Sequence, residues 1–371
     1  MHVLWLVSMT LPQAAAACGL PGASDVSGGW LTGQLTALRD HPTLQLAVVC
    51  VDARQQAERC GDWDGVRYHI LPSAEDFPAL LKQHRPDLVH IWGTEYAAAA
   101  AMQQAAAAQN LPVLIGMQGV MRDCAAHLCD GVPPRYRQST KLDHLLDRLI
   151  PGALLDNLQA SFDALAQSEA ALLGQARHIT GRTAFDRQAV TDLAPQARYF
   201  SCNETLRPAF SRGPLWQARH FGRAPVLLLS QGNYPLKNLH TVLQALPAIL
   251  QRWPDAQLRI AGWPPLDKGP LFQPLIGRLF PYQRYCRELA AQLGVTDHIR
   301  YTGPLDAAAM RQAYLDAEGL TNAVTTVLSA PDGGTALGQA ARARALQTHD
   351  AAANAEALTG IYQTILQEET R

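Results

Sequence analysis

A single lysine follows a glycine-containing turn at the end of an apolar run in the second half of the chain. The run Val226–Gln231 has the composition of a buried strand, and the hexapeptide from Gly232 to Lys237 comes directly after it. A helical stretch and a second apolar run at Leu258–Gly262 complete a parallel βαβ unit. Sheets of this kind bind ligands outside the carboxyl ends of their strands. Lys237, with Gly232 and Asn233 beside it, is therefore a candidate diphosphate ligand, although a lone lysine that starts a helix can equally be solvated.

A second group of polar residues ends an apolar run in the first half of the chain. His90-Ile91-Trp92-Gly93-Thr94-Glu95 closes the predicted strand Leu88–Trp92. A histidine or a carboxylate at the carboxyl end of a strand can exchange protons or bind sugar hydroxyls. His90 lies within the apolar strand, where a histidine is more often a core residue. Glu95 lies beyond the strand and is the better candidate.

Two short patterns occupy predicted strand-to-helix turns. Gly28 and Gly29 precede a helix, and two glycines there let backbone amides approach a phosphate or a sugar, or simply form a tight turn. Arg182 follows the predicted strand at 178–180. It can clamp an anionic acceptor or organise a cleft, or be one of several surface arginines beside a helix cap at Thr183.

Other catalytic signatures are absent from the sequence. There is no G-x-S-x-G, no Walker loop, no H-E-x-x-H and no G-x-G-x-x-G, which disfavours a nicotinamide oxidoreductase. The seven cysteines include no C-x-x-C pair, and their odd number and wide scatter favour reduced thiols in a cytoplasmic protein. No histidine and carboxylate residues have metal-ligand spacing, so we expect a metal-independent protein without a cofactor.

Alternating apolar and helical segments supply the scaffold that positions these residues. Strands are predicted at 3–9, 46–51, 66–71, 88–92, 113–117, 178–180 and 198–200 in the first half, and at Val226–Gln231, Leu258–Gly262 and Ile299–Gly303 in the second. This alternation indicates doubly wound parallel sheets, that is, an α/β fold. Residues 120–175 interrupt the rhythm with largely helical sequence. One helix in that stretch has Leu142, Leu145, Leu146 and Leu149 on one face.

The length of 371 residues suits two domains. Prolines and arginines with little periodicity mark residues 207–225, and we place a linker at 211–224. We expect an amino-terminal domain at 1–210 and an abbreviated carboxyl-terminal domain at 225–348 with about three parallel strands. The last helix, at 349–371, is expected to pack back towards the first domain.

The charge balance and the lengths of the apolar runs limit which kinds of partner the chain can bind. The chain has 31 Lys and Arg against 32 Asp and Glu, a net charge of -1, which argues against a nucleic-acid partner. No Lys or Arg precedes the apolar run Val3–Val7, so a first strand explains it better than a signal peptide. No apolar run approaches the length of a membrane-spanning helix, so any membrane contact would be peripheral.

In this order along residues 1 to about 317, the motifs resemble glycosyltransferase family 4. The resemblance covers the Gly-Gly loop, His-Ile-Trp-Gly-Thr-Glu, Gly-Arg-Thr-x-x-Asp-Arg, Ser-Gln-Gly-Asn-Tyr-Pro-Leu-Lys-Asn, Pro-Asp-Ala-Gln-Leu-Arg-Ile-Ala-Gly and Tyr-Thr-Gly-Pro-Leu. It implies a GT-B fold of two Rossmann-like domains and retaining sugar transfer from a nucleotide-sugar donor. It also implies a saccharide or lipid-linked acceptor, as in bacterial polysaccharide biosynthesis, in the cytoplasm or at the inner face of the membrane.

The resemblance also distributes roles among the candidate residues. The donor diphosphate would bind at Gly232, Asn233 and Lys237, together with the Gly28-Gly29 loop. Glu95 and Arg182 would line the acceptor side. His90 and Glu95 are the weak candidates for a catalytic role.

The chain departs from the family pattern in three places. The family often has an arginine at Asn233 and a second histidine at Trp92. After Ala317 it continues with a strand and a Glu-x7-Glu segment that contacts the donor sugar and the ribose, whereas this chain has no such pair there. In a doubly wound sheet, loss of the later strands leaves the first strand at an open edge, which can support self-association. A catalytically inactive remnant that binds partners or acts as a scaffold is therefore the alternative.

Overall fold

The computed structural model describes residues 1–21, 28–150, 152–211, 224–262, 277–316 and 335–370. The chain forms two compact units. Unit 1 comprises Met1–Asp123, Asp163–Ser211 and Ala345–Arg371, and unit 2 comprises Cys124–Phe162 and Arg212–Arg344, each in its described residues. Helices α5 (Met121–His127), α8 (Leu155–Gly174) and α16 (Thr335–Thr348) have residues in both units.

Unit 1 contains an eight-stranded sheet in the order β3-β4-β2-β1-β5-β6-β7-β8. The strands are β1 His2–Val7, β2 Gln45–Val51, β3 Arg59–Trp63, β4 Val66–Leu71, β5 Leu88–Trp92, β6 Val113–Gly116, β7 His178–Gly181 and β8 Arg198–Ser201. All neighbours are parallel except the β3-β4 hairpin. This confirms the expected doubly wound sheet, and the strand order reverses at the β1-β5 pair.

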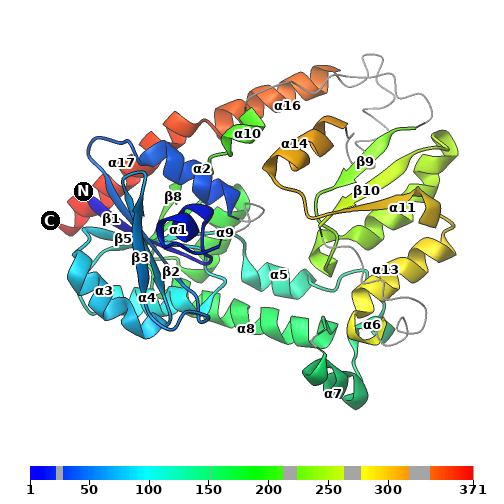
Figure 1. Cartoon of the computed structure of the whole chain (residues 1–371), viewed down its shortest axis with the longest axis horizontal. Helices are drawn as coiled ribbons and strands as arrows, with labels where there is room; N and C mark the ends of the chain where they lie inside the picture. The colour runs from blue at the N-terminus through cyan, green and yellow to red at the C-terminus, as the bar shows by residue number, and fades with distance from the viewer. Residues whose placement is uncertain (22–27, 151, 212–223, 263–276, 317–334, 371) are drawn as a thin grey trace. The chain divides into compact units, whose positions relative to one another are not determined.

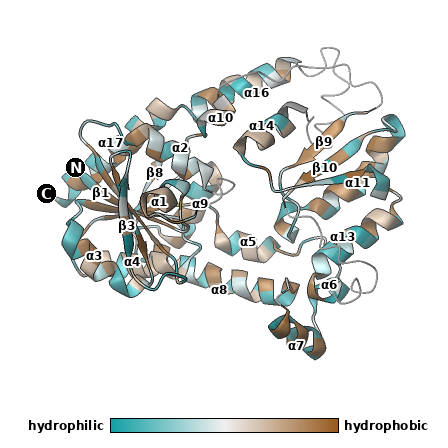
Figure 2. Ribbon diagram, in the orientation of Figure 1, coloured by the Kyte–Doolittle hydropathy of each residue, from teal (hydrophilic) through white to brown (hydrophobic). Residues whose placement is uncertain are grey.

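The first strand shows how the sequence builds two hydrophobic layers. Val3 to Val7 of β1 are all buried, as expected for a parallel strand covered on both faces. Leu4 and Leu6 belong to one core cluster, with residues of α3, α4, α8 and α9. Val3, Trp5 and Val7 belong to the other, with residues of α2 and α17. Figure 2 shows these strands as hydrophobic ribbons.

Helices of unit 1 cover both faces of this sheet. They are α1 Pro12–Ala17, α2 Gly29–Leu38, the 3-10 helix η1 Ala74–Asp76, α3 Phe77–His84, α4 Ala97–Ala107, α9 Ala184–Leu193, α10 Pro208–Ser211 and the carboxyl-terminal α17 Ala351–Glu369. The start of α17 is fixed to the loop after β8, because the Glu204 carbonyl accepts hydrogen bonds from His349 Nδ1 at 2.7 Å and Asn354 Nδ2 at 3.2 Å. The last helix thus packs on the amino-terminal sheet.

Unit 2 has a three-stranded sheet in its described residues, in the order β11-β10-β9. Its elements are β9 Val226–Leu229, η2 Pro235–Lys237, α11 Leu239–Arg252, β10 Gln257–Ala261, α13 Pro281–Gln292, η3 Thr296–His298, β11 Ile299–Gly303 and α14 Ala307–Asp316. The strands are parallel, and within the described part of the chain β9 pairs with β10 alone. The expected linker falls mostly on residues 212–223, which lie outside the described residues. The departure from the family pattern after Ala317 falls on residues 317–334, which also lie outside them.

One segment belongs to a different unit from the one that the sequence predicted. Cys124–Phe162, with the short helices α6 (Pro134–Arg137) and α7 (Lys141–Leu149), is part of unit 2 and not of a domain at 1–210. Tyr136 is buried in the same cluster as residues of α11 and α13. Arg278 Nε donates to Asp143 Oδ1 at 2.6 Å, and Asp130 O lies 3.0 Å from His240 Nε2. These partners lie more than 100 residues away in sequence, beyond the reach of local periodicity.

The structure bears on two further sequence expectations. All seven cysteines lie among the described residues and carry free thiols. Within the described residues, no helix is both long and apolar enough to cross a bilayer.

Candidate functional site

The carboxyl ends of the unit 1 strands carry most of the candidate residues. Gly93, Thr94 and Glu95 follow β5, which is paired to β1 at the point where the strand order reverses. Gln118 follows β6, Arg182 follows β7 and Glu204 follows β8. Doubly wound sheets bind their ligands at such a switch point.

Glu95 is held by its own loop. Its Oε2 accepts the Thr94 backbone N–H at 2.8 Å. Gly93 has φ +100°, and a Cβ at Gly93 would lie 2.7 Å from Glu95 Oε2. Only glycine therefore permits both this backbone conformation and the folded-back carboxylate. Burial raises the pKa of the Glu95 carboxyl.

A second carboxylate, which the sequence analysis missed, lies in the same place. Glu169 on α8 is fully buried. Its Oε2 accepts the Thr94 hydroxyl, and its Oε1 accepts the Met121 backbone N–H at 2.7 Å. Burial is the main cause that raises the pKa of Glu169, and the charge of Glu95 adds to it. A glutamate three positions before buried Leu172 was the available signal, since it shares the buried face of the helix.

His90 is a core residue of unit 1. It is fully buried and stacks on Trp92 with ring centroids 3.9 Å apart. Tyr362 Oη accepts from Trp5 Nε1 at 2.9 Å and lies 2.7 Å from His90 Nδ1. The Tyr362 hydroxyl thus joins the Trp5 and His90 side chains, with one proton to donate and two lone pairs that can accept. Burial lowers the pKa of His90 well below its usual value, so the ring is neutral. His90 therefore has the surroundings of a core histidine and not those of a catalytic one.

Arg182 connects the ends of three strands. Its Nη1 pairs with Glu204 Oε1 at 2.7 Å, and its Nη2 donates to the Gln118 carbonyl at 2.9 Å. The backbone at Arg182 is held by Asp186, whose Oδ2 accepts from the Arg182 N–H at 2.8 Å and from the Thr183 N–H at 3.0 Å. These contacts match an arginine that organises the loops at the strand ends more closely than one that clamps an anionic acceptor.

The Gly28-Gly29 pair begins α2. Gly28 is the N-cap residue and has φ +68°, which favours glycine. A Cβ at Gly29 would lie 2.1 Å from Arg207 Nε, so the missing side chain lets the Arg207 guanidinium approach the start of the helix. A cation and a helix N-terminus both favour an anion. Arg207 was missed because it lies far along the chain, in a stretch that was interpreted as a linker.

In unit 2, the predicted donor residues follow β9. A Cβ at Gly232 would lie 2.9 Å from Ile260 Cγ2, so glycine is needed where the turn crosses β10. Gly232 and Asn233 line a cavity of about 10 Å³ with Tyr282 and Tyr301. Such a volume suits about one water molecule.

Lys237 is half-buried at the end of η2, directly before α11. Its Nζ lies 5.4 Å from the Tyr234 ring centroid, within cation–π range. Lys237 does not line the small cavity beside Gly232 and Asn233. The three residues therefore share the carboxyl end of β9 but not one closed pocket.

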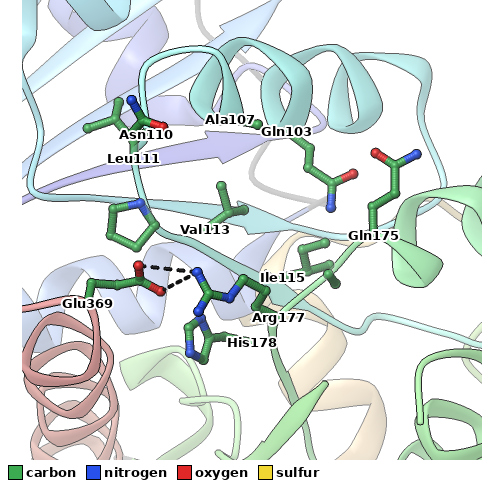
Figure 3. Close-up of a pocket in the computed structure, with 12 residues that line it drawn as sticks. Gln103, Ala107, Asn110, Leu111, Val113, Ile115, Gln175, Arg177, His178 and Glu369 are labelled. Carbon is green, nitrogen blue, oxygen red and sulfur yellow. Dashed lines mark hydrogen bonds and ion pairs between the residues drawn. The ribbon is translucent and has the colours of Figure 1, made fainter. Parts of the chain in front are cut away.

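A larger cavity, of about 280 Å³, lies at the amino ends of strands in the unit 1 sheet, opposite the carboxyl ends that carry the candidate residues (Figure 3). Its lining includes Val113 and His178, the first residues of β6 and β7. Arg177 Nη1 pairs there with Glu369 Oε1 of α17 at 3.0 Å. None of the predicted site residues lines it. No group of three or more metal-ligating side chains occurs among the residues that the structure describes.

The chain is similar in structure to several solved proteins. It matches no protein-family profile and no curated relative. Sucrose-phosphate synthase from Thermosynechococcus elongatus superposes with a TM-score of 0.67 at 13% identity, over 99% of each chain. Anabaena HepE, solved with UDP and glucose, gives 0.58 at 11% identity, over 98% of this chain and 100% of its own. Trehalose-6-phosphate synthase from Burkholderia multivorans gives 0.56 at 11% identity, over 99% of each chain. These likenesses establish the GT-B fold of the chain.

Proposed function

We propose that this GT-B protein is a glycosyltransferase that moves a sugar from a nucleotide-sugar donor to a saccharide or lipid-linked acceptor, with retention of configuration. The observation that carries the proposal is the placement of a lysine at the carboxyl end of β9, on a fold shared with sucrose-phosphate synthase and trehalose-6-phosphate synthase. HepE, of the same fold, was solved with UDP and glucose. Its UDP supports a nucleotide-sugar donor.

On the donor side, Lys237 neutralises the diphosphate and Gly232 lets the backbone approach it. A retaining transferase mainly orients the donor and stabilises the departing diphosphate. A cation at the end of β9 supplies that charge as a point charge. Lys237 is half-buried, where the local dielectric constant is lower than in water. The attraction between its ammonium group and a phosphate is therefore stronger than it would be in bulk water.

On the acceptor side, Glu95 contacts sugar hydroxyls while Arg182 keeps the surrounding loops in place. The raised pKa of Glu95 makes this carboxyl a candidate proton-transfer group. Arg207 beside Gly29 places a cation at the start of α2. We propose that the reaction uses no metal, that the protein works in the cytoplasm, and that a lipid-linked acceptor brings it to a membrane surface.

The second candidate function is that of a non-catalytic binding protein. The sequence after Ala317 lacks the Glu-x7-Glu pair of the family that the chain resembles, and β9 has one strand neighbour in the described residues. Without the acidic side of a donor site, the cation alone can bind a diphosphate without positioning a sugar for transfer. Self-association through the edge of β9 belongs to this alternative.

Calorimetric titration of the whole chain with UDP, other nucleoside diphosphates and their sugar conjugates separates the two functions. Saturable binding of a nucleotide sugar, followed by its consumption in the presence of an acceptor, is the expected result. Binding of the free diphosphate without turnover of any sugar nucleotide favours the binding protein. No saturable binding at millimolar concentrations of any of these ligands would refute both the donor site and the transferase.

A further inference from the structure

One short helix of unit 2 has its apolar side turned outwards. In α7 and the residue after it, Leu142, Leu145, Leu149 and Ile150 are between 47% and 72% exposed. Single exposed leucines are ordinary on protein surfaces, whereas a contiguous apolar group marks an interaction site. Figure 2 shows the hydrophobic residues along α7. Ordinary surface helices have the opposite arrangement, with the leucines facing the core.

The polar side of α7 is the side that faces unit 2. Asp143 is buried, and its carboxylate accepts from Arg278 Nε at 2.6 Å and from Thr140 Oγ1 at 2.7 Å. Asp147 Oδ1 accepts the Gly152 N–H at 2.8 Å. Both acidic residues of the helix are thus occupied by contacts within the unit. These contacts hold the helix in the orientation that exposes the leucines.

The charges that remain outside are basic. Lys141 and Arg148 are exposed. Lys141, Leu145 and Arg148 follow the i, i+4, i+7 spacing of one helix side. Arg135 and Arg137 precede them, so residues 134–150 carry four arginines and lysines against two aspartates, a net charge of +2 in a chain of -1.

We propose that α7 is a docking helix for the surface of an anionic phospholipid membrane. Leucines flanked by lysine and arginine match an interfacial helix, whose apolar side enters the acyl boundary while its cations meet acidic headgroups. A second copy of the chain fits less well, because a twofold contact of this face with itself would bring the two basic side chains of one copy, Lys141 and Arg148, towards those of the other. This surface is independent of donor binding.

Sedimentation of the whole chain with lipid vesicles tests the proposal. The probes are vesicles of phosphatidylcholine alone and vesicles of phosphatidylcholine mixed with phosphatidylglycerol. The natural protein is expected to bind the mixed vesicles more strongly, and less so as the salt concentration rises. The double variant Leu145→Gln, Leu149→Gln should lower the partition coefficient about tenfold, since it removes two of the four exposed apolar side chains.

Three controls keep the result interpretable. Leu337→Gln, Leu346→Gln removes two exposed leucines of α16 and should bind vesicles like the natural protein. Lys141→Gln, Arg148→Gln should lose the preference for phosphatidylglycerol. Circular dichroism and nucleotide calorimetry on each variant show that fold and donor binding are unchanged, so the two proposals can fail separately.

Three results would overturn the docking helix. The first is a natural protein that sediments with neither kind of vesicle. The second is an α7 variant that binds vesicles as well as the α16 control. The third is a concentration-dependent dimer, seen by analytical ultracentrifugation, that the α7 variant abolishes while vesicle binding stays unaffected. That result would assign the leucines to a contact between copies.

Discussion

At the scale of single residues, the environment of each side chain separates the candidates that the sequence grouped together. His90 and Glu95 come from one hexapeptide, yet His90 is locked in the core by Tyr362 while Glu95 lies past the strand end. The decisive difference is that His90 lies within the buried strand β5, whereas Glu95 follows its carboxyl end. Glu95, Glu169 and Lys237 are therefore better functional candidates than His90.

Lys237→Ala should weaken the binding of a nucleoside diphosphate about tenfold or more, because hydrogen bonds between charged groups contribute roughly 1.5–3 kcal/mol. Calorimetric titration measures the change. Lys82→Ala, which removes an exposed lysine of α3, is the matched control and should leave the affinity unaltered. Equal affinities of the two variants would exclude Lys237 from the donor site.

Glu169→Ala should lower the free energy of unfolding by about 2 kcal/mol or more, because it leaves the Thr94 hydroxyl and the buried Met121 N–H without an acceptor. Glu169→Gln should cost less, since an amide oxygen can accept from Met121 while its nitrogen donates to the Thr94 oxygen. Urea unfolding at neutral pH compares the three proteins. If Glu169→Gln lowered the free energy of unfolding as much as Glu169→Ala, the assigned hydrogen bonds to Thr94 and Met121 would be contradicted.

The raised pKa of Glu169 also predicts a pH dependence. Its folded pKa lies above the ordinary value of 4.5, so the folded protein binds more protons than the unfolded chain between those two values. The stability contribution of Glu169 is complete below pH 4.5 and is lost as the pH rises through the folded pKa. The difference in unfolding free energy between natural protein and Glu169→Gln should therefore fall with rising pH. A difference that rises would show a lowered pKa.

At the scale of elements, the terminal helix α17 is part of the unit 1 core. Tyr362, Leu358 and Ile365 of α17 are buried in the same cluster as Trp5. A hydrogen-bonded chain from Trp5 through Tyr362 to His90 joins that helix to β1 and β5. The helix is thus a required layer over the sheet.

Tyr362→Phe should destabilise the protein by about 2–3 kcal/mol, since it removes the acceptor of the Trp5 N–H and the partner of His90 Nδ1 in a buried place. Gln363→Ala, at the neighbouring exposed position, should change stability by less than about 0.5 kcal/mol. Urea unfolding measures both. Donor binding by the folded variant should be unaltered.

The β3-β4 hairpin shows an element that the sequence analysis missed. β3 has the polar sequence Arg-Cys-Gly-Asp-Trp and lies at the sheet edge, so the apolar pattern does not reveal it. The signal was Asp64-Gly65, which turns the hairpin with φ +51° and +76°. Buried central strands such as β1 and β5 were predicted because both of their faces need apolar residues.

At the scale of the whole molecule, a mostly parallel sheet in unit 1 and a parallel sheet in unit 2 each carry candidate residues at the carboxyl ends of their strands. We expect no metal in the proposed reaction, because in the proposed donor site a lysine and not a metal ion neutralises the diphosphate. Dialysis against EDTA should therefore leave both nucleotide binding and sugar transfer unchanged, with calorimetry and product analysis as the measurements. Activity that is lost with EDTA and restored by added Mg²⁺ or Mn²⁺ would contradict this.

The sequence by itself determined the α/β class, the parallel strands and the βαβ unit that carries Lys237, because burial period and turn residues are local properties of the chain. Only the tertiary structure decided that Cys124–Phe162 joins unit 2 and that the leucines of α7 face outwards. It also brought Glu169 to Thr94 and Arg207 to Gly29. Each of these depends on partners far apart in sequence. The direction in which an amphipathic face points is set by what the polar face binds, and here Arg278 holds Asp143 from 135 residues away.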